Sequence, residues 1–89
     1  MLKELLKNDI IKYTKLQDRD AVNILKLVVN DVNMYYLKYG TESDDKKIKA
    51  VIKNFIHKSE ESYTEYKKAG RSDLAEKEKY EKAILSSYL

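Results

Sequence analysis

Cysteine and proline are absent from this 89-residue chain, and glycine occurs only at Gly40 and Gly70. Without cysteine the chain has no disulfide framework and no thiolate zinc site. Strands need turns, and most turns draw on Gly, Pro, Asn or Asp for their backbone angles. An all-β or α/β layout is therefore disfavoured, and the many Lys, Glu, Leu and Ala residues favour helices.

Long apolar runs are also missing, since none approaches the roughly 18 residues that span a bilayer. The first residues, 1–7, carry too many charges for the apolar centre of a signal peptide. We therefore expect a soluble, cytoplasmic protein that does not contact a membrane. The length allows one helical domain, 1–89, with a thin core and little room for a deep pocket, so no small-molecule substrate is expected.

Apolar residues recur at three- and four-residue steps along most of the chain, which is the spacing of helical faces. The fold class that this predicts is all-α, a small bundle of about four helices. Gly70 is expected to end the third helix in the left-handed conformation, so that the last two helices form a projecting αα-hairpin. Asp18 or Asp20 is expected to cap the second helix, a segment at 41–44 the third, and Ser72 or Asp73 the fourth. The predicted helices are 2–16, 20–39, 43–69 and 73–88.

The second predicted helix is apolar on more than one face, which is typical of a helix around which the others pack. The fourth is mostly charged in its middle, at 76–82, and is expected to be the least firmly held element. The core should be formed where the apolar faces of three adjoining helices meet. Its predicted members are Leu6, Leu25, Val28, Val32, Ile52, Phe55 and Ile56.

The run from Glu65 to Glu78, EYKKAGRSDLAEKE, resembles the signature of the GatB/YqeY family, an acid and an aromatic followed by AGR-x-DLA-x-KE. A spaced glutamate at Glu81 and the ending IL-x-x-YL at 84–89 continue the resemblance, as does Lys26 within the apolar second helix. The resemblance implies the helical amino-terminal half of that family. It also implies a relation to the tail of the B subunit of glutamyl-tRNA amidotransferase, which contacts tRNA.

Residues for catalysis or metal binding are few. His57 is the only histidine, and although Glu60 and Glu61 follow it at helical spacing, further imidazole or thiolate ligands are lacking. No nucleophile with a base can be assembled, and a glycine-rich phosphate loop is absent. We therefore expect a protein that is not an enzyme and has neither a metal nor another cofactor.

Two groups of cations are candidates for contact with phosphates. Lys46, Lys49 and Lys53 share one side of the predicted third helix, and Lys67, Lys68 and Arg71 cluster at the turn after it. The net charge of only +3 and the acids among these residues weaken a nucleic-acid interpretation. Surface lysines that only keep the protein soluble would give the same pattern.

Eight tyrosines are many for a chain of this length. Tyrosine joins apolar area to a polar end and is favoured at interfaces, although a tyrosine-rich core edge remains the alternative. The sequence thus favours a non-catalytic helical module, adaptor or inhibitor-like, that binds another protein or a second copy of itself. A tRNA-associated module stays open as the other function. The candidate interface residues are Tyr35, Tyr36, Tyr39, Tyr63 and Tyr66.

Overall fold

The computed structural model describes residues 1–41 and 43–89; Glu42, in the predicted capping segment of the third helix, lies outside the described residues. The described part of the chain is all-α, as predicted. Each helix begins and ends within two residues of its predicted bounds. The helices are α1 (Leu2–Lys15), α2 (Arg19–Tyr39), α3 (Asp45–Lys68) and α4 (Ser72–Ser86).

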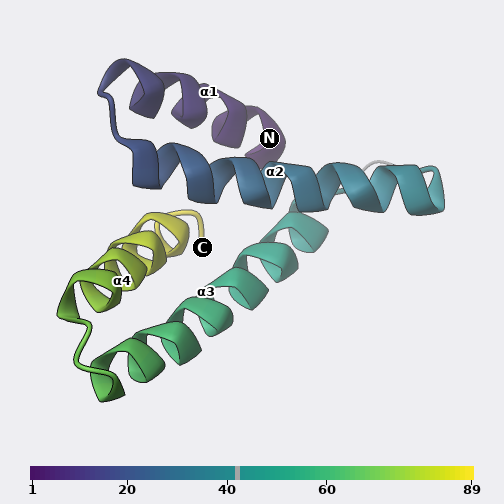
Figure 1. The fold of residues 1–89 in the computed structure, drawn as a ribbon. Helices are drawn as coiled ribbons and strands as arrows, with labels where there is room; N and C mark the ends of the chain where they lie inside the picture. The colour runs from purple at the N-terminus through teal and green to yellow at the C-terminus, as the bar shows by residue number, and fades with distance from the viewer. Residues whose placement is uncertain (42) are drawn as a thin grey trace.

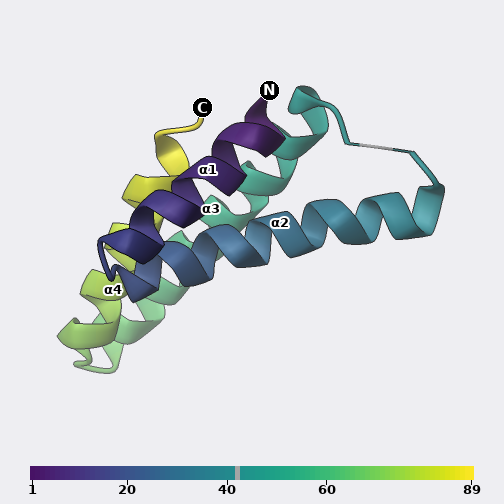
Figure 2. The ribbon, with the colours of Figure 1, turned by 90° about the horizontal axis from the view of Figure 1, so that it is seen from above.

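The helices form two hairpins, α1 with α2 and α3 with α4 (Figure 1). α3 and α4 are the most closely packed pair, and α2 touches all three other helices. Seen from above, α2 crosses the bundle and continues past it (Figure 2). None of the helices in the described ranges is both long enough and apolar enough to cross a membrane.

Side-chain caps start two of the helices. Asp18 accepts a hydrogen bond from the Ala21 N–H (3.1 Å) and Asp44 one from the Lys47 N–H (2.8 Å), so each satisfies a free donor of a first turn. The predicted cap of α4 by Ser72 or Asp73 is wrong. α4 follows Arg71 and has no side-chain cap, because Asp73 already lies inside the helix, where its carboxylate binds the Arg71 guanidinium.

Two left-handed residues end α1 and α3. At Gly70 φ is +72°, and the Arg71 N–H donates back to the Tyr66 carbonyl, which confirms the predicted stop. The same arrangement ends α1, where φ is +58° at Gln17 and the Asp18 N–H donates to the Tyr13 carbonyl. The position of Gln17 was not predicted, because glutamine gives no signal for a conformation that its Cβ disfavours.

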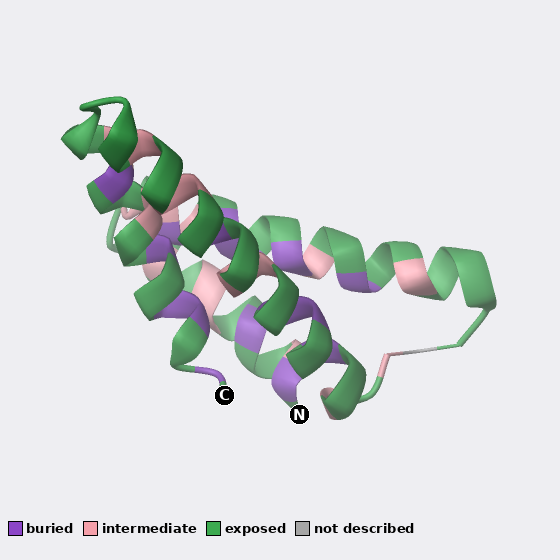
Figure 3. Cartoon of the chain, turned by 90° about the horizontal axis from the view of Figure 1, so that it is seen from below, coloured by how far each residue is buried: buried purple, intermediate pink, exposed green. Residues whose placement is uncertain are grey.

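Five of the predicted core residues are buried, and two are not. Phe55 and Ile56 are only partly buried and pack against the edge of the core. The reason is the direction of α3. Its buried apolar residues all lie in the first two turns of the helix, up to Ile52 (Figure 3). Beyond Ile52, α3 runs away from α2 and lies beside α4 (Figure 1). The five confirmed core residues are Leu6, Leu25, Val28, Val32 and Ile52.

α4 closes the core and is not loosely held, contrary to the prediction. Most of its charged middle faces solvent, although Glu81 is buried. Ala75, Ile84 and Leu85 are also buried, and Tyr88 follows them into the core. Two hydroxyls then join this segment to the first hairpin. Tyr88 donates to Asp9 of α1 at 2.5 Å, and Tyr80 donates to Asp18 at the start of α2.

These hydrogen bonds raise the pKa values of both tyrosines. The bond to Asp18, followed by burial, raises the pKa of Tyr80 to about 12. Burial first, and then the bond to Asp9, raises the pKa of Tyr88 well above its usual range. A third link joins α1 to α3, because the Asp45 carboxylate accepts from the Leu2 N–H at 3.1 Å.

The molecule is longer than a compact chain of its size. The Cα radius of gyration is 13.7 Å, against about 12 Å expected for 89 residues. The principal extents are 43 × 28 × 20 Å. The last buried residue of α2 is Val32, seven positions before the helix ends at Tyr39, so about 10 Å of helix extends beyond the core.

We expect Ile52→Ala to lower the free energy of unfolding by about 2–5 kcal/mol, because it leaves a cavity in a fully buried site. Phe55→Ala should cost less, about 1–2 kcal/mol, because part of its ring is already in water. Urea denaturation of both variants measures the difference. A larger loss for Phe55→Ala would place that ring in the core.

Gln17→Gly should raise the free energy of unfolding by up to about 1 kcal/mol, since glycine adopts the left-handed conformation without strain but has more freedom when unfolded. Gln17→Ala is the matched control and should give no gain. Thermal unfolding followed by circular dichroism compares the two. A melting temperature that rises equally in both variants would mean that the backbone angle is not the cause.

The raised pKa of Tyr80 predicts alkaline destabilisation. The folded protein holds this proton more tightly than the unfolded chain does, so the contribution is complete below pH 10 and is lost as pH rises toward 12. Tyr80→Phe should be less stable than wild type at pH 9, and the difference should shrink at pH 11. Urea denaturation at both values tests this, with Tyr36→Phe as the control. A constant difference would show that ionisation of Tyr80 is not involved.

Candidate functional site

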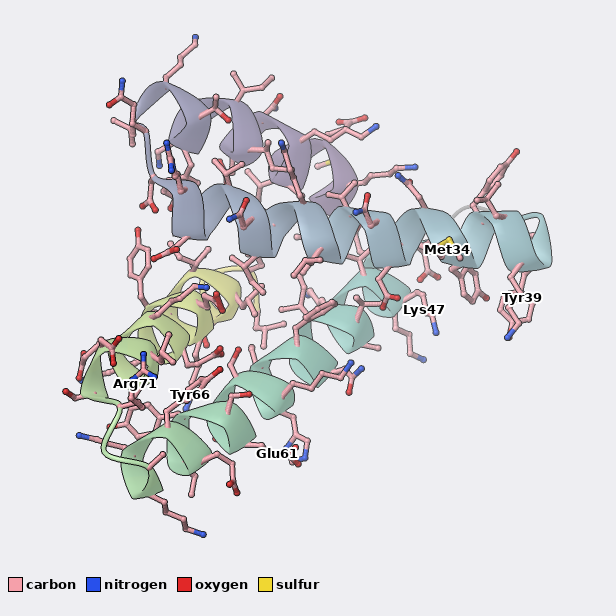
Figure 4. All side chains as sticks on the ribbon, in the orientation of Figure 1. Met34, Tyr39, Lys47, Glu61, Tyr66 and Arg71 are labelled. Carbon is pink, nitrogen blue, oxygen red and sulfur yellow. The ribbon has the colours of Figure 1, made fainter. Side chains whose placement is uncertain are left out.

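Three of the predicted interface tyrosines come together on the part of α2 that leaves the bundle. We call the segment Met34–Tyr39 the α2 arm; it contains Tyr35, Tyr36 and Tyr39 (Figure 4). Tyr36 and Tyr39 are exposed, and Tyr35 is half-buried. Among the described residues, no other helix covers the end of the arm (Figures 1 and 2).

The arm also exposes two aliphatic side chains that were not among the predicted interface residues. Met34 is 61% and Leu37 is 74% exposed. A signal for them was present in the sequence, because α2 is apolar on more than one face up to its last turn. Which of those faces remains uncovered depends on where α3 leaves α2, and this cannot be read from the spacing of residues within α2.

The tyrosines continue the buried row of α2. Ile24, Val28 and Val32 are buried, and Tyr35 and Tyr39 follow at the same three- and four-residue spacing. The two rings pack on each other with centroids 4.7 Å apart and planes inclined by 44°. A row typical of a helical core therefore continues for two turns beyond its last buried member, Val32.

A groove runs between the arm and the start of α3. Lys47 of α3 places its Nζ 4.7 Å from the centroid of the Tyr35 ring, so that an α3 side chain closes one side (Figure 4). Tyr36 lies about 200° around the helix from Met34 and faces away. Among the described residues the groove is lined by Asp31, Met34, Tyr35, Leu37, Lys38, Tyr39, Lys47 and Val51.

The two other predicted interface tyrosines lie elsewhere. Tyr63 and Tyr66 are half-buried near the far end of α3, beside the turn into α4 (Figure 4). Lys67 places its Nζ 5.8 Å from the Tyr63 ring. The five candidate tyrosines therefore form two groups at opposite ends of the molecule.

The two predicted cation groups lie at different positions along α3. Lys46, Lys49 and Lys53 are exposed in its first half, and within the described ranges they form no ion pair. Lys67 and Lys68 are exposed in its last turn, about 27 Å from Lys49 at the rise of an α-helix. The structure thus keeps the two groups apart and does not join them into one patch.

Arg71, beside the second cation group, is already engaged. Its guanidinium donates two hydrogen bonds to Asp73, at 3.3 and 3.2 Å. This pairing raises the pKa of Arg71 and lowers the pKa of Asp73. A phosphate at this turn would have to compete with the carboxylate, so Arg71 contributes less net charge than the sequence suggests.

The acids that the sequence offered for metal or proton chemistry are dispersed. His57 binds Glu61 at 2.9 Å on the exposed side of α3, and Glu60 pairs with Lys82 of α4 at 3.5 Å. In the part of the chain that the structure describes, no three His, Asp or Glu residues gather closely enough to hold a metal ion.

Glu81 is buried, and this burial, together with the nearby Glu78 and Asp20, raises its pKa.

A family model described as Yqey-like protein matches residues 3–89. The match spans almost the whole chain and agrees with the resemblance drawn from the run Glu65–Glu78. The chain therefore belongs to the Yqey-like protein family. A comparison with curated proteins gave no match.

Proposed function

We propose that this chain is a non-catalytic binding module, adaptor or inhibitor-like, that binds another protein through the α2 arm. The observation that carries this proposal is the core-like row of α2, which continues into solvent at Tyr35 and Tyr39 with Met34 and Leu37 beside it. Exposed apolar clusters of this kind mark interaction sites, because leaving them in water is unfavourable.

The shape of the surface supports a protein partner. Tyrosine and methionine are enriched at protein interfaces, and a projecting helix presents them as a rigid edge. The base of α2 is fixed by the core, so the arm loses little freedom on binding. In its described lining the groove has one carboxylate, Asp31, and no histidine or serine, so it offers no nucleophile with a base.

A tRNA-associated role is the second candidate. It is supported by the exposed and unpaired Lys46, Lys49 and Lys53 in the described part of α3, which could follow a phosphate backbone. Its other support, the cluster of Lys67, Lys68 and Arg71, is weakened by the ion pair between Arg71 and Asp73. We therefore place the protein-binding function first.

A photo-reactive amino acid at Leu37 should cross-link a protein partner in native cells, because this side chain is at the tip of the arm. The matched control is the same probe at Ile11, which is 56% exposed on α1 and lies outside the arm. Leu37→Glu should reduce recovery of the partner by about tenfold or more. Its melting temperature should stay near that of wild type, since the site is exposed.

Recovery of the same proteins with the probe at Leu37 and with the probe at Ile11 would contradict specific binding at the arm.

The tRNA function is tested in parallel by titrating labelled tRNA against wild type at rising salt concentrations. We expect no binding at physiological salt. Binding that weakens steeply with salt, and whose salt slope flattens by up to about three when Lys46, Lys49 and Lys53 become Gln, would favour the tRNA function.

A further inference from the structure

We propose that the partner of the α2 arm is a second copy of this chain, bound antiparallel along one face of α2. This inference rests on the proposed function and adds the identity of the partner. The face concerned is formed by Leu27, Asp31, Met34 and Lys38, which follow one another at three- and four-residue spacing and fall within about 60° around the helix. All four are exposed.

The charges on this face are self-complementary. Asp31 and Lys38 are seven residues apart along this face, with Met34 between them along the helix axis, and both line the groove. Asp31 has no ion pair within the described residues, and the Lys38 Nζ lies 5.4 Å from the Tyr39 ring. The face therefore presents one unpaired anion and one accessible cation, separated by an apolar centre.

Antiparallel pairing satisfies both charges at once. A two-fold axis beside Met34 and Tyr35 brings Asp31 of each copy opposite Lys38 of the other, as an isologous interface requires. A parallel arrangement would instead place Asp31 against Asp31 and Lys38 against Lys38, which is repulsive. The opposite charges of Asp31 and Lys38 thus select the antiparallel direction.

The apolar part of this face is formed by Leu27 and Met34, which are 52% and 61% exposed. A standard interface buries roughly 800 Å² on each partner, so the contact extends beyond these two side chains. The groove between the arm and α3 supplies further area through Tyr35 and Val51. Since the arm stands clear of the other helices, a second arm can lie along it without moving the bundle (Figure 2).

Cross-linking tests the geometry directly, because the chain has no cysteine of its own. Met34→Cys places a thiol next to the proposed axis, whereas Tyr36→Cys, the matched control, places one on the opposite side of α2. Under mild oxidation the first variant should form a disulfide-linked dimer and the second should remain monomeric. Equal cross-linking of the two, or of neither, would overturn the antiparallel dimer.

Charge reversal tests the pairing without a covalent bond. Asp31→Lys alone, or Lys38→Asp alone, should weaken dimerisation by about tenfold in sedimentation equilibrium, because two attractions become two repulsions. Mixing the two single variants should restore it, since each copy then offers the charges that the other lacks. Single variants that dimerise as well as wild type would overturn the proposal.

Different results would contradict the proposed binding arm and the proposed dimer. A wild-type chain that stays monomeric at every concentration, yet cross-links a different protein through Leu37, would overturn the second copy as partner and leave the binding arm in place. A chain that neither dimerises nor cross-links a protein through the arm would overturn both. Circular dichroism of each variant checks that the helices are retained.

Discussion

The coverage of α2 is the constraint on which the rest of this structure depends. α2 carries an apolar row over its whole length, but the other helices of the described residues bury this row only as far as Val32. Inside that limit the row forms the core with Leu6, Ile52 and Leu85. Beyond it, the same kind of side chain becomes surface, and this exposed part of the helix is the proposed binding arm.

The proposed binding arm and the cation cluster at the turn between α3 and α4 lie far apart in this molecule (Figure 4). The α2 arm lies at one end and the turn with Arg71 at the other (Figure 4). Lys67 and Lys68 precede this turn in the last turn of α3, and Lys46, Lys49 and Lys53 lie in the first half of α3. Contact with a protein at the arm would therefore leave the far turn accessible. The carboxylate of Asp73 offsets part of the positive charge at this turn, whereas the lysines in the first half of α3 have no such partner among the described residues.

The sequence predicted helix number and bounds well because those depend on local signals: apolar spacing, the glycine at 70 and the cap at Asp18. It failed where distant segments decide. Phe55 has the spacing of a core residue, yet its burial depends on the path of α3 relative to α2. The tyrosine count indicated an interface, but the division between Tyr35 and Tyr63 follows only from the three-dimensional arrangement.

The hydroxyl–carboxylate bonds between the hairpins bear on the order of folding. Tyr80 and Asp18 are 62 residues apart in sequence, and Tyr88 and Asp9 are 79 apart. Each hairpin brings together only neighbouring segments, which closes short loops quickly, whereas these bonds close almost the whole chain. The hairpins should form first and dock afterwards, so that loss of either hydroxyl mainly speeds unfolding and leaves the folding rate nearly unchanged.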